Sequence, residues 1–220
     1  MGKIYTDAPV LGRWEPKWHE EVYVATQAGG VFFTQDFQGP LKPQPHWTPV
    51  NEGLPVLTCK QFFVDPFAKR YRQFVLLTNS ELYMREGGGA WQKILDLSYG
   101  DSLPDGNHPG NILAYFWPDR LIPGRLWVHY GPTGVEQGAY YAFRTDDYGA
   151  TWKSYFIAPE FFTYDIGPIM SYGNYVWAAV NDGAGGEGGI RISTDSGNAP
   201  PCADPDEYGR CPWPKYPVHM

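Results

Sequence analysis

The chain has 220 residues, of which 17% are aromatic and 19% charged, and it contains 26 Gly and 21 Pro. Its net charge of −7 disfavours nucleic acid or an anionic membrane surface as a partner, and no apolar run approaches the roughly 20 residues that span a bilayer. Frequent Gly and Pro argue against long helices. These properties favour one sizeable all-β domain.

Short strands are predicted along most of the chain, because apolar runs are bounded by Gly, Pro, Asn and Asp. The strands group into four units, at residues 20–55, 56–98, 110–158 and 163–197. The two central units are expected to have four strands each. The first unit lacks an inner strand and the last an outer one, and residues 198–220 are predicted to be a Pro-rich coil or docking tail.

The clearest motif lies in the third unit, where Thr145, Asp147, Gly149 and Trp152 fill the pattern Ser/Thr-x-Asp-x-Gly-x-x-Trp. Asp147 is placed to accept bonds from backbone N–H groups of a tight turn, and Thr145 adds a hydroxyl to the same network. Gly149 suits a positive φ, and Trp152 opens the next strand with a large apolar ring. This pattern predicts a hairpin that is locked by its own side chains.

The motif resembles the Asp-box, the hairpin repeat of sialidase-like β-propellers, which include xyloglucanase- and sortilin-type repeats. Ser193, Asp195 and Gly197 match half of it near the end of the fourth unit, but no Trp follows at the expected spacing. Partial versions begin near residues 34 and 84, so the repeat is about 50 residues long. The resemblance implies a β-propeller or propeller arc of about four four-stranded antiparallel blades.

The incomplete end units allow two ways of completing a propeller. Residues before Glu20 can pair with the last blade and close a small ring, or the chain is an arc that another chain or further sequence completes. Sialidase-like relatives usually have more than four blades, which favours the arc. The open blade edges then imply a protein partner or self-association. A glycan is an alternative ligand, whereas nucleic acid and membrane insertion are not expected.

Glycoside hydrolysis is the alternative function, because Asp-box propellers include glycosidases. Such an enzyme needs two carboxylates at a defined separation, and Asp65, Asp119 and Asp165 lie at or near the ends of inner strands. The pairs Asp65-Pro66 and Pro118-Asp119 also suit turns, where both residue types are favoured for local backbone reasons. We therefore predict turn roles there and a non-catalytic interaction or structural module.

No cofactor and no metal are predicted. The acidic and Gly-rich stretches at 101–105 and 181–189 follow no known calcium-ligand spacing. Of the three cysteines, Cys202 and Cys211 bracket a turn-rich loop that can close as a disulfide in an oxidising compartment. Cys59 lies in an apolar run, which favours a buried thiol. The family resemblance favours an extracellular or surface location, although the chain shows no signal peptide.

Many aromatic residues remain after the blade tryptophans Trp47, Trp91 and Trp152 are assigned. Flat rings can stack on sugars or anchor a protein partner, and they can also fill the narrow spaces between blades. We expect packing for most of them. The residues concerned are Trp117, Trp127, Tyr130, Tyr140, Tyr141, Tyr172 and Trp177.

Overall fold

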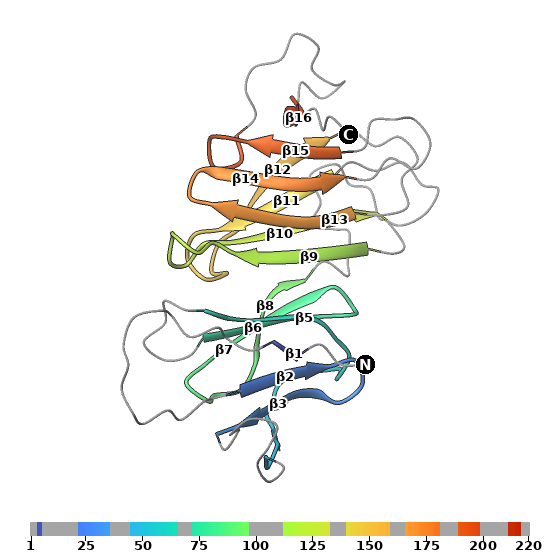
Figure 1. Ribbon diagram of the computed structural model, residues 1–220, viewed down its shortest axis with the longest axis vertical. Coiled ribbons are helices and arrows are strands. Elements are labelled where there is room, and N and C mark those ends of the chain that lie inside the picture. The colour runs from blue at the N-terminus through green and yellow to red at the C-terminus, as the bar shows by residue number, and fades with distance from the viewer. Residues whose placement is uncertain are drawn as a thin grey trace. The chain divides into compact units, whose positions relative to one another are not determined.

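The computed structural model describes residues 4–5, 22–35, 45–65, 72–96, 112–132, 140–158, 166–180, 189–198 and 211–216. These residues form sixteen β-strands in four four-stranded antiparallel sheets (Figure 1). None of the described residues forms a helix with the length and apolarity needed to cross a bilayer.

Each sheet is a meander in which strands that follow one another in the chain lie side by side. The first consists of β1 (Ile4–Tyr5), β2 (Val22–Thr26), β3 (Gly30–Thr34) and β4 (Thr48–Pro49). The second consists of β5 (Cys59–Asp65), β6 (Arg72–Leu77), β7 (Glu81–Glu86) and β8 (Gln92–Asp96). The third consists of β9 (Ile112–Pro118), β10 (Leu126–Pro132), β11 (Tyr140–Thr145) and β12 (Lys153–Ala158). The fourth consists of β13 (Ile166–Tyr172), β14 (Tyr175–Val180), β15 (Gly189–Ser193) and β16 (Lys215–Tyr216).

A four-stranded antiparallel meander is the form of a propeller blade, so the predicted all-β class with four such blades is confirmed. We call the four sheets the first to fourth blades. The chain divides into two compact units, residues 1–95 and 96–220. The first unit carries the first and second blades, and the second unit carries the third and fourth.

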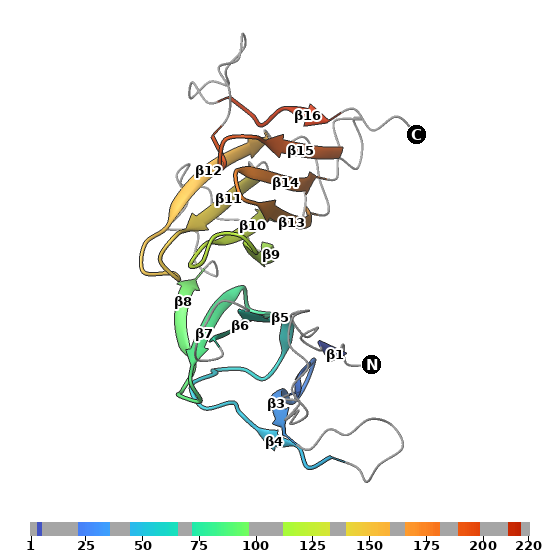
Figure 2. The ribbon, with the colours of Figure 1, turned by 60° about the vertical axis from the view of Figure 1, so that its left-hand side comes forward.

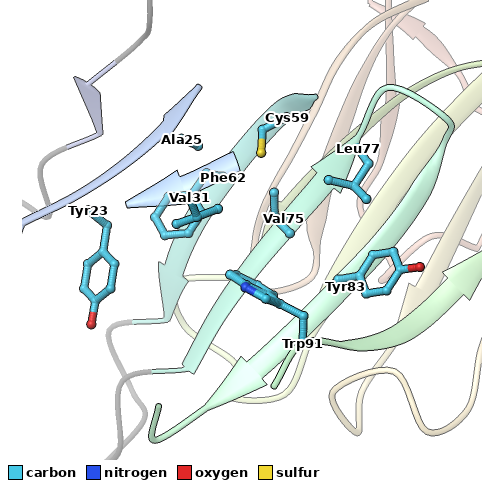
Figure 3. Close-up of a cluster of buried hydrophobic side chains, with 9 residues drawn as sticks. All are labelled: Tyr23, Ala25, Val31, Cys59, Phe62, Val75, Leu77, Tyr83 and Trp91. Atoms are coloured by element: carbon cyan, nitrogen blue, oxygen red, sulfur yellow. The ribbon is translucent and has the colours of Figure 1, made fainter. Parts of the chain in front are cut away.

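The core of the first unit lies between its two blades (Figure 3). Tyr23, Ala25 and Val31 face inward from β2 and β3, because side chains of a strand alternate between its two faces. They meet apolar side chains of the second blade, namely Cys59, Phe62, Val75, Leu77, Tyr83 and Trp91. Cys59 is free and buried, as predicted, and burial raises the pKa of its thiol to about 11.

In the second unit the third and fourth blades lie side by side (Figure 2), and apolar side chains of both blades form its core. Trp127, Ala142 and Ile157 come from the third blade. Their partners from the fourth blade are Ile169, Val176, Ala178, Val180 and Trp213. The rings of Trp127 and Trp213 meet edge to face, with centroids 6.1 Å apart and an interplanar angle of 80°. In both units, therefore, one blade face is buried against another blade face.

The first and last blades have more strands than we predict from the sequence. Ile4 and Tyr5 pair with Val24 and Tyr23, so this short strand belongs to the first blade and not to the last. The prediction of three-stranded end blades is therefore wrong. Strands of two residues are too short to show any apolar alternation, and for that reason the sequence pattern does not reveal them.

The prediction of a coil or docking tail at residues 198–220 is also wrong for part of this segment. Its strand β16 pairs with β15, with Lys215 opposite Arg191 and Tyr216 opposite Ile190. Trp213, directly before this strand, is completely buried. At least residues 211–216 therefore belong to the fourth blade.

Candidate functional site

The turn after β11 is held by a set of short side-chain bonds. The hydroxyl oxygen of Thr145 accepts from the backbone N–H groups of Asp147 (3.2 Å) and Gly149 (2.8 Å), and the hydroxyl donates to Asp147 Oδ1 (2.6 Å). The Asp147 carboxylate also accepts from the backbone N–H and the hydroxyl of Thr151, at 2.8 and 2.6 Å. The turn requires positive φ at Tyr148 (60°) and Gly149 (95°).

These bonds also define the charge state of the turn. The hydroxyl of Thr145, followed by the Thr151 side chain and backbone, lowers the pKa of Asp147 to about 2. Asp147 therefore stays ionised near neutral pH and cannot act there as a proton donor. Trp152 donates its indole N–H to the carbonyl of Gly149 at 3.1 Å, and its ring is half-buried rather than part of the core.

The turn after β15 follows the same backbone path. The hydroxyl oxygen of Ser193 accepts from the N–H groups of Asp195 (3.3 Å) and Gly197 (2.9 Å), as Thr145 does one blade earlier. Ser196 and Gly197 have φ values of 50° and 98°. The hydroxyl of Ser193 donates to the carbonyl of Asn198 (2.9 Å) instead of to an aspartate.

The tryptophan that this second turn lacks in sequence is supplied from farther along the chain. Trp213 donates its indole N–H to the carbonyl of Gly197 at 2.7 Å, which matches the bond from Trp152 to Gly149. Fixed spacing hides this residue, because an insertion lies between Asn198 and Trp213. The signal that can find it is a lone Trp after a Pro-rich insertion, followed by a short pairing segment.

A largely buried arginine joins the third blade to the turn of the fourth. Arg144 lies over the rings of Trp127 and Tyr155, 5.7 and 5.2 Å from their centroids. It also pairs with Asp146 at 3.0 Å and donates to the carbonyl of Ser196. These contacts fix the position of the fourth-blade turn against the third blade.

The second-blade turn keeps the backbone conformation without the aspartate. Gly87 and Gly88 have φ values of 59° and 82°, and Gly89 donates its N–H to the carbonyl of Glu86 at 3.1 Å. Trp91 is buried and donates its indole N–H to the carbonyl of Val50 at 2.6 Å. In the first blade, the corresponding motif lies largely outside the described residues.

Both carboxylate oxygens of Asp119 accept hydrogen bonds from the protein itself. It is buried, and its Oδ1 accepts from the backbone N–H groups of Leu121 (2.8 Å) and Ile122 (3.1 Å). Its Oδ2 accepts from the hydroxyl of Ser171 on β13 at 2.7 Å. Asp119 therefore holds the turn after β9 and links it to the fourth blade.

Of the other two candidate carboxylates, the structure describes only Asp65. Asp65 is buried in the first unit, opposite Arg72 in the strand register, with 3.7 Å between the guanidinium Nη1 and Oδ2. Arg72 also pairs with Glu86 at 2.9 Å. Asp165 lies outside the described residues.

The structure describes only some of the residues that were considered for a metal site or a disulfide. Among the described residues no group of three or more His, Cys, Asp or Glu side chains is placed to hold a metal ion. The acidic and Gly-rich loops at 101–105 and 181–188 lie outside them. Cys211 is bonded in a disulfide, whereas its predicted partner, Cys202, lies outside the described residues, so the pair stays a prediction.

One buried titratable residue, His129, is not among the candidate residues that the sequence motifs indicate. His129 on β10 is completely buried, and its Nδ1–H donates to the carbonyl of Gly167 on β13 at 3.0 Å. Burial lowers the pKa of this imidazole to about 4, so it is neutral at physiological pH. Only the alternation of β10 hints at its burial. It fastens the third blade to the fourth.

The aromatic residues divide between packing and exposure. Trp127, Tyr130 and Tyr141 are buried, as expected for rings that fill the space beside a blade. Tyr172 is 59% exposed, and it lies beside Tyr175, which is 51% exposed and does not stand out in the sequence. The side chain of Tyr140 lies outside the described set.

Comparison with solved structures supports the fold. The chain is similar to the crystal structure of an ancestral GH74 enzyme, with a TM-score of 0.50 and 15% sequence identity. The match covers 86% of this chain but only 24% of that enzyme's chain. No protein-family model and no curated protein matches the sequence. At this identity the likeness concerns the propeller type of fold alone.

Proposed function

We propose that this chain is a non-catalytic, protein-binding β-propeller module that works within a larger assembly. The observation that carries the proposal is the environment of Asp119. A glycosidase carboxylate must reach the sugar, whereas both Asp119 oxygens accept bonds from the protein and the residue is 3% exposed.

The surroundings of Asp65 support the same proposal. Its carboxylate is buried against the Arg72 guanidinium, which also binds Glu86. A carboxylate buried in this way lacks access to a substrate. Protein binding is further supported by a blade face that exposes large apolar side chains, since such patches mark interaction sites.

A carbohydrate-active module is the second candidate. The observation that favours it is the fold likeness to an ancestral GH74 enzyme. Exposed Tyr172 and Tyr175 also offer ring faces on which a sugar can stack. In this alternative the chain corresponds to one part of a longer enzyme.

Hydrolysis of a panel of soluble glycans, with xyloglucan included, separates the two candidates. We expect no release of reducing ends above that of heat-denatured protein. Release that is lost in Asp119→Asn or Asp165→Asn, with an unchanged circular dichroism spectrum, would establish the enzyme instead. Glycan binding without hydrolysis, abolished by Tyr172→Ser, would favour a carbohydrate-binding module over protein binding.

A further inference from the structure

Arg85 on β7 is a largely buried cation, and no described Asp or Glu forms an ion pair with it. Its Nη1 donates to the carbonyl of Val50 at 3.3 Å, whereas its Nε is buried and makes no hydrogen bond. Burial lowers the pKa of its guanidinium, which still stays protonated at neutral pH. Arg72, Arg125 and Arg144, in contrast, each pair with a carboxylate. Buried charges in folded proteins are normally paired, so the position of Arg85 calls for an anion.

A second buried polar group without a partner lies on the neighbouring strand. Gln73 on β6 is directly opposite Arg85 in the strand register. It is 1% exposed, and its Oε1 accepts no hydrogen bond. Side chains directly opposite one another in an antiparallel pair lie on the same face, with Cβ atoms about 4.5–5.5 Å apart. The second blade therefore brings an unused donor, the Nε–H of Arg85, and an unused acceptor, the Oε1 of Gln73, to one place.

Aromatic side chains of the first and second blades lie around these two groups. The guanidinium of Arg85 lies over the Trp91 ring, 5.6 Å from its centroid. Tyr23 on the facing blade is close enough to act on the charge of Arg85, and its ring lies 4.8 Å from that of Phe33 (Figure 3). Phe33 and Val50 are only partly buried. The two polar groups therefore lie at the margin of the core, where small side-chain shifts admit a ligand.

We propose that Arg85 and Gln73 form a binding site for a small 2-hydroxy acid. The carboxylate of such a ligand accepts from the guanidinium of Arg85, whose planar edge matches two carboxylate oxygens. The hydroxyl on the neighbouring carbon donates to the Oε1 of Gln73. One ligand thereby provides the missing anion and satisfies both polar groups.

The combination of one unused donor with one unused acceptor selects this class of ligand. A plain carboxylate, such as an Asp or Glu side chain of a protein partner, has no donor for Gln73. An amino acid supplies its donor as an ammonium group, which the guanidinium of Arg85 repels. A hydroxyl donates without a charge, and the single charge of the carboxylate matches the single cation of the site.

Titration of the isotope-labelled full chain with glycolate and with acetate, at pH 7 and constant ionic strength, tests this site. These two acids differ by one hydroxyl. We expect the Nε–H resonance of Arg85 to shift saturably with glycolate, and the dissociation constant for acetate to be about fivefold higher, because one hydrogen bond typically contributes about that factor. Sodium chloride should give no saturable shift. The Nε–H resonance of Arg125 is the internal control, since this group already donates to Asp146 at 2.6 Å and should not respond.

Two variants separate the roles of the two residues, and an unchanged melting curve shows that each variant is folded. Gln73→Leu should bind glycolate no better than acetate, and Arg85→Met should bind neither.

The absence of a saturable shift in the original chain, or an equal shift with chloride, overturns the site. Equal affinities of the original chain for the two acids overturn the 2-hydroxy acid as its ligand. Both results come from the original chain, so they hold even if Arg85→Met does not fold. The inference does not depend on the proposed function, and its failure leaves protein binding and the glycan assay untouched.

Discussion

The hydroxyl of Thr145 has more structural partners than its size suggests. It accepts two backbone N–H groups, donates to Asp147, and is almost completely buried. Thr145→Val keeps the shape and removes all three bonds. We expect it to lower the free energy of unfolding by about 1–3 kcal/mol, because buried N–H groups then lack an acceptor.

Urea denaturation measures this loss, and Thr151→Val provides the comparison. The Thr151 hydroxyl binds the same aspartate but is exposed, so water can replace it. Thr151→Val should therefore lower the free energy of unfolding clearly less than Thr145→Val does. If the two substitutions have equal effects, burial of the Thr145 network is not what holds the turn.

His129 makes stability depend on pH. Its folded pKa, about 4, lies below the ordinary value of 6.5 because burial disfavours the charged ring. Between these values the unfolded chain binds a proton that the folded chain does not, so stability is complete above pH 6.5 and declines as the pH falls to 4. The decline should total about 3 kcal/mol.

The free energy of unfolding, measured from pH 7 to pH 4, checks the contribution of His129. His129→Gln should flatten the curve in this window. Equal slopes for the two proteins would mean that His129 already binds a proton in the folded state.

The three cysteines should differ in reactivity. Burial raises the pKa of Cys59 to about 11, so little of its reactive thiolate is present at pH 8, and Cys211 is in a disulfide. We expect Ellman's reagent to find no thiol in the native chain and one after unfolding without reductant. Three thiols in the unfolded, unreduced chain would show that the disulfide is absent.

At the scale of the element, the turns after β11 and β15 share a backbone but differ in their surroundings. Gly149 and Gly197 both have positive φ, near 95°. A Cβ atom on Gly197 would also lie 2.5 Å from the Trp127 ring and 2.9 Å from Tyr155. The contacts of Arg144 hold these groups in place.

This difference predicts unequal costs for the same substitution. The backbone strain of Gly149→Ala should cost about 1–2 kcal/mol, because its φ is positive. Gly197→Ala adds a steric clash in a packed region, which typically costs a further 1–3 kcal/mol. Thermal and urea unfolding of both variants measure the gap. Equal losses would place Gly197 in a looser environment than the structure shows.

The sequence predicts elements well where they are long or carry a motif. The hairpin at 145–152 and the alternation of β2, β5 and β9 are local signals, and the structure has strands at each of them. The strands β1 and β16 depend on pairing with distant residues, and two residues cannot display a period. Trp213 is missed for a related reason, because its place in the turn depends on the length of an insertion.

At the scale of the whole molecule, the repeat of about 50 residues predicts the number of blades correctly. Exposure is not predictable in the same way. The apolar alternation of β13–β15 is the same whether the side chains of Met170 and Tyr175 face a neighbouring blade or open solvent, so it does not predict their exposure. Likewise, Asp119 stands beside Pro118 as a turn residue would, but its bond to Ser171 appears only in three dimensions.

The central claim of this account is that the chain builds four complete four-stranded blades, including the two strands that sequence patterns miss. Cross-strand nuclear Overhauser effects measured on the isotope-labelled chain test it most directly. We expect such contacts between Tyr5 and Tyr23 and between Arg191 and Lys215, alongside those that join β2 to β3 and β14 to β15. If the contacts between β2 and β3 and between β14 and β15 appear, but those of Tyr5 with Tyr23 and of Arg191 with Lys215 do not, the end blades have three strands and the claim is wrong.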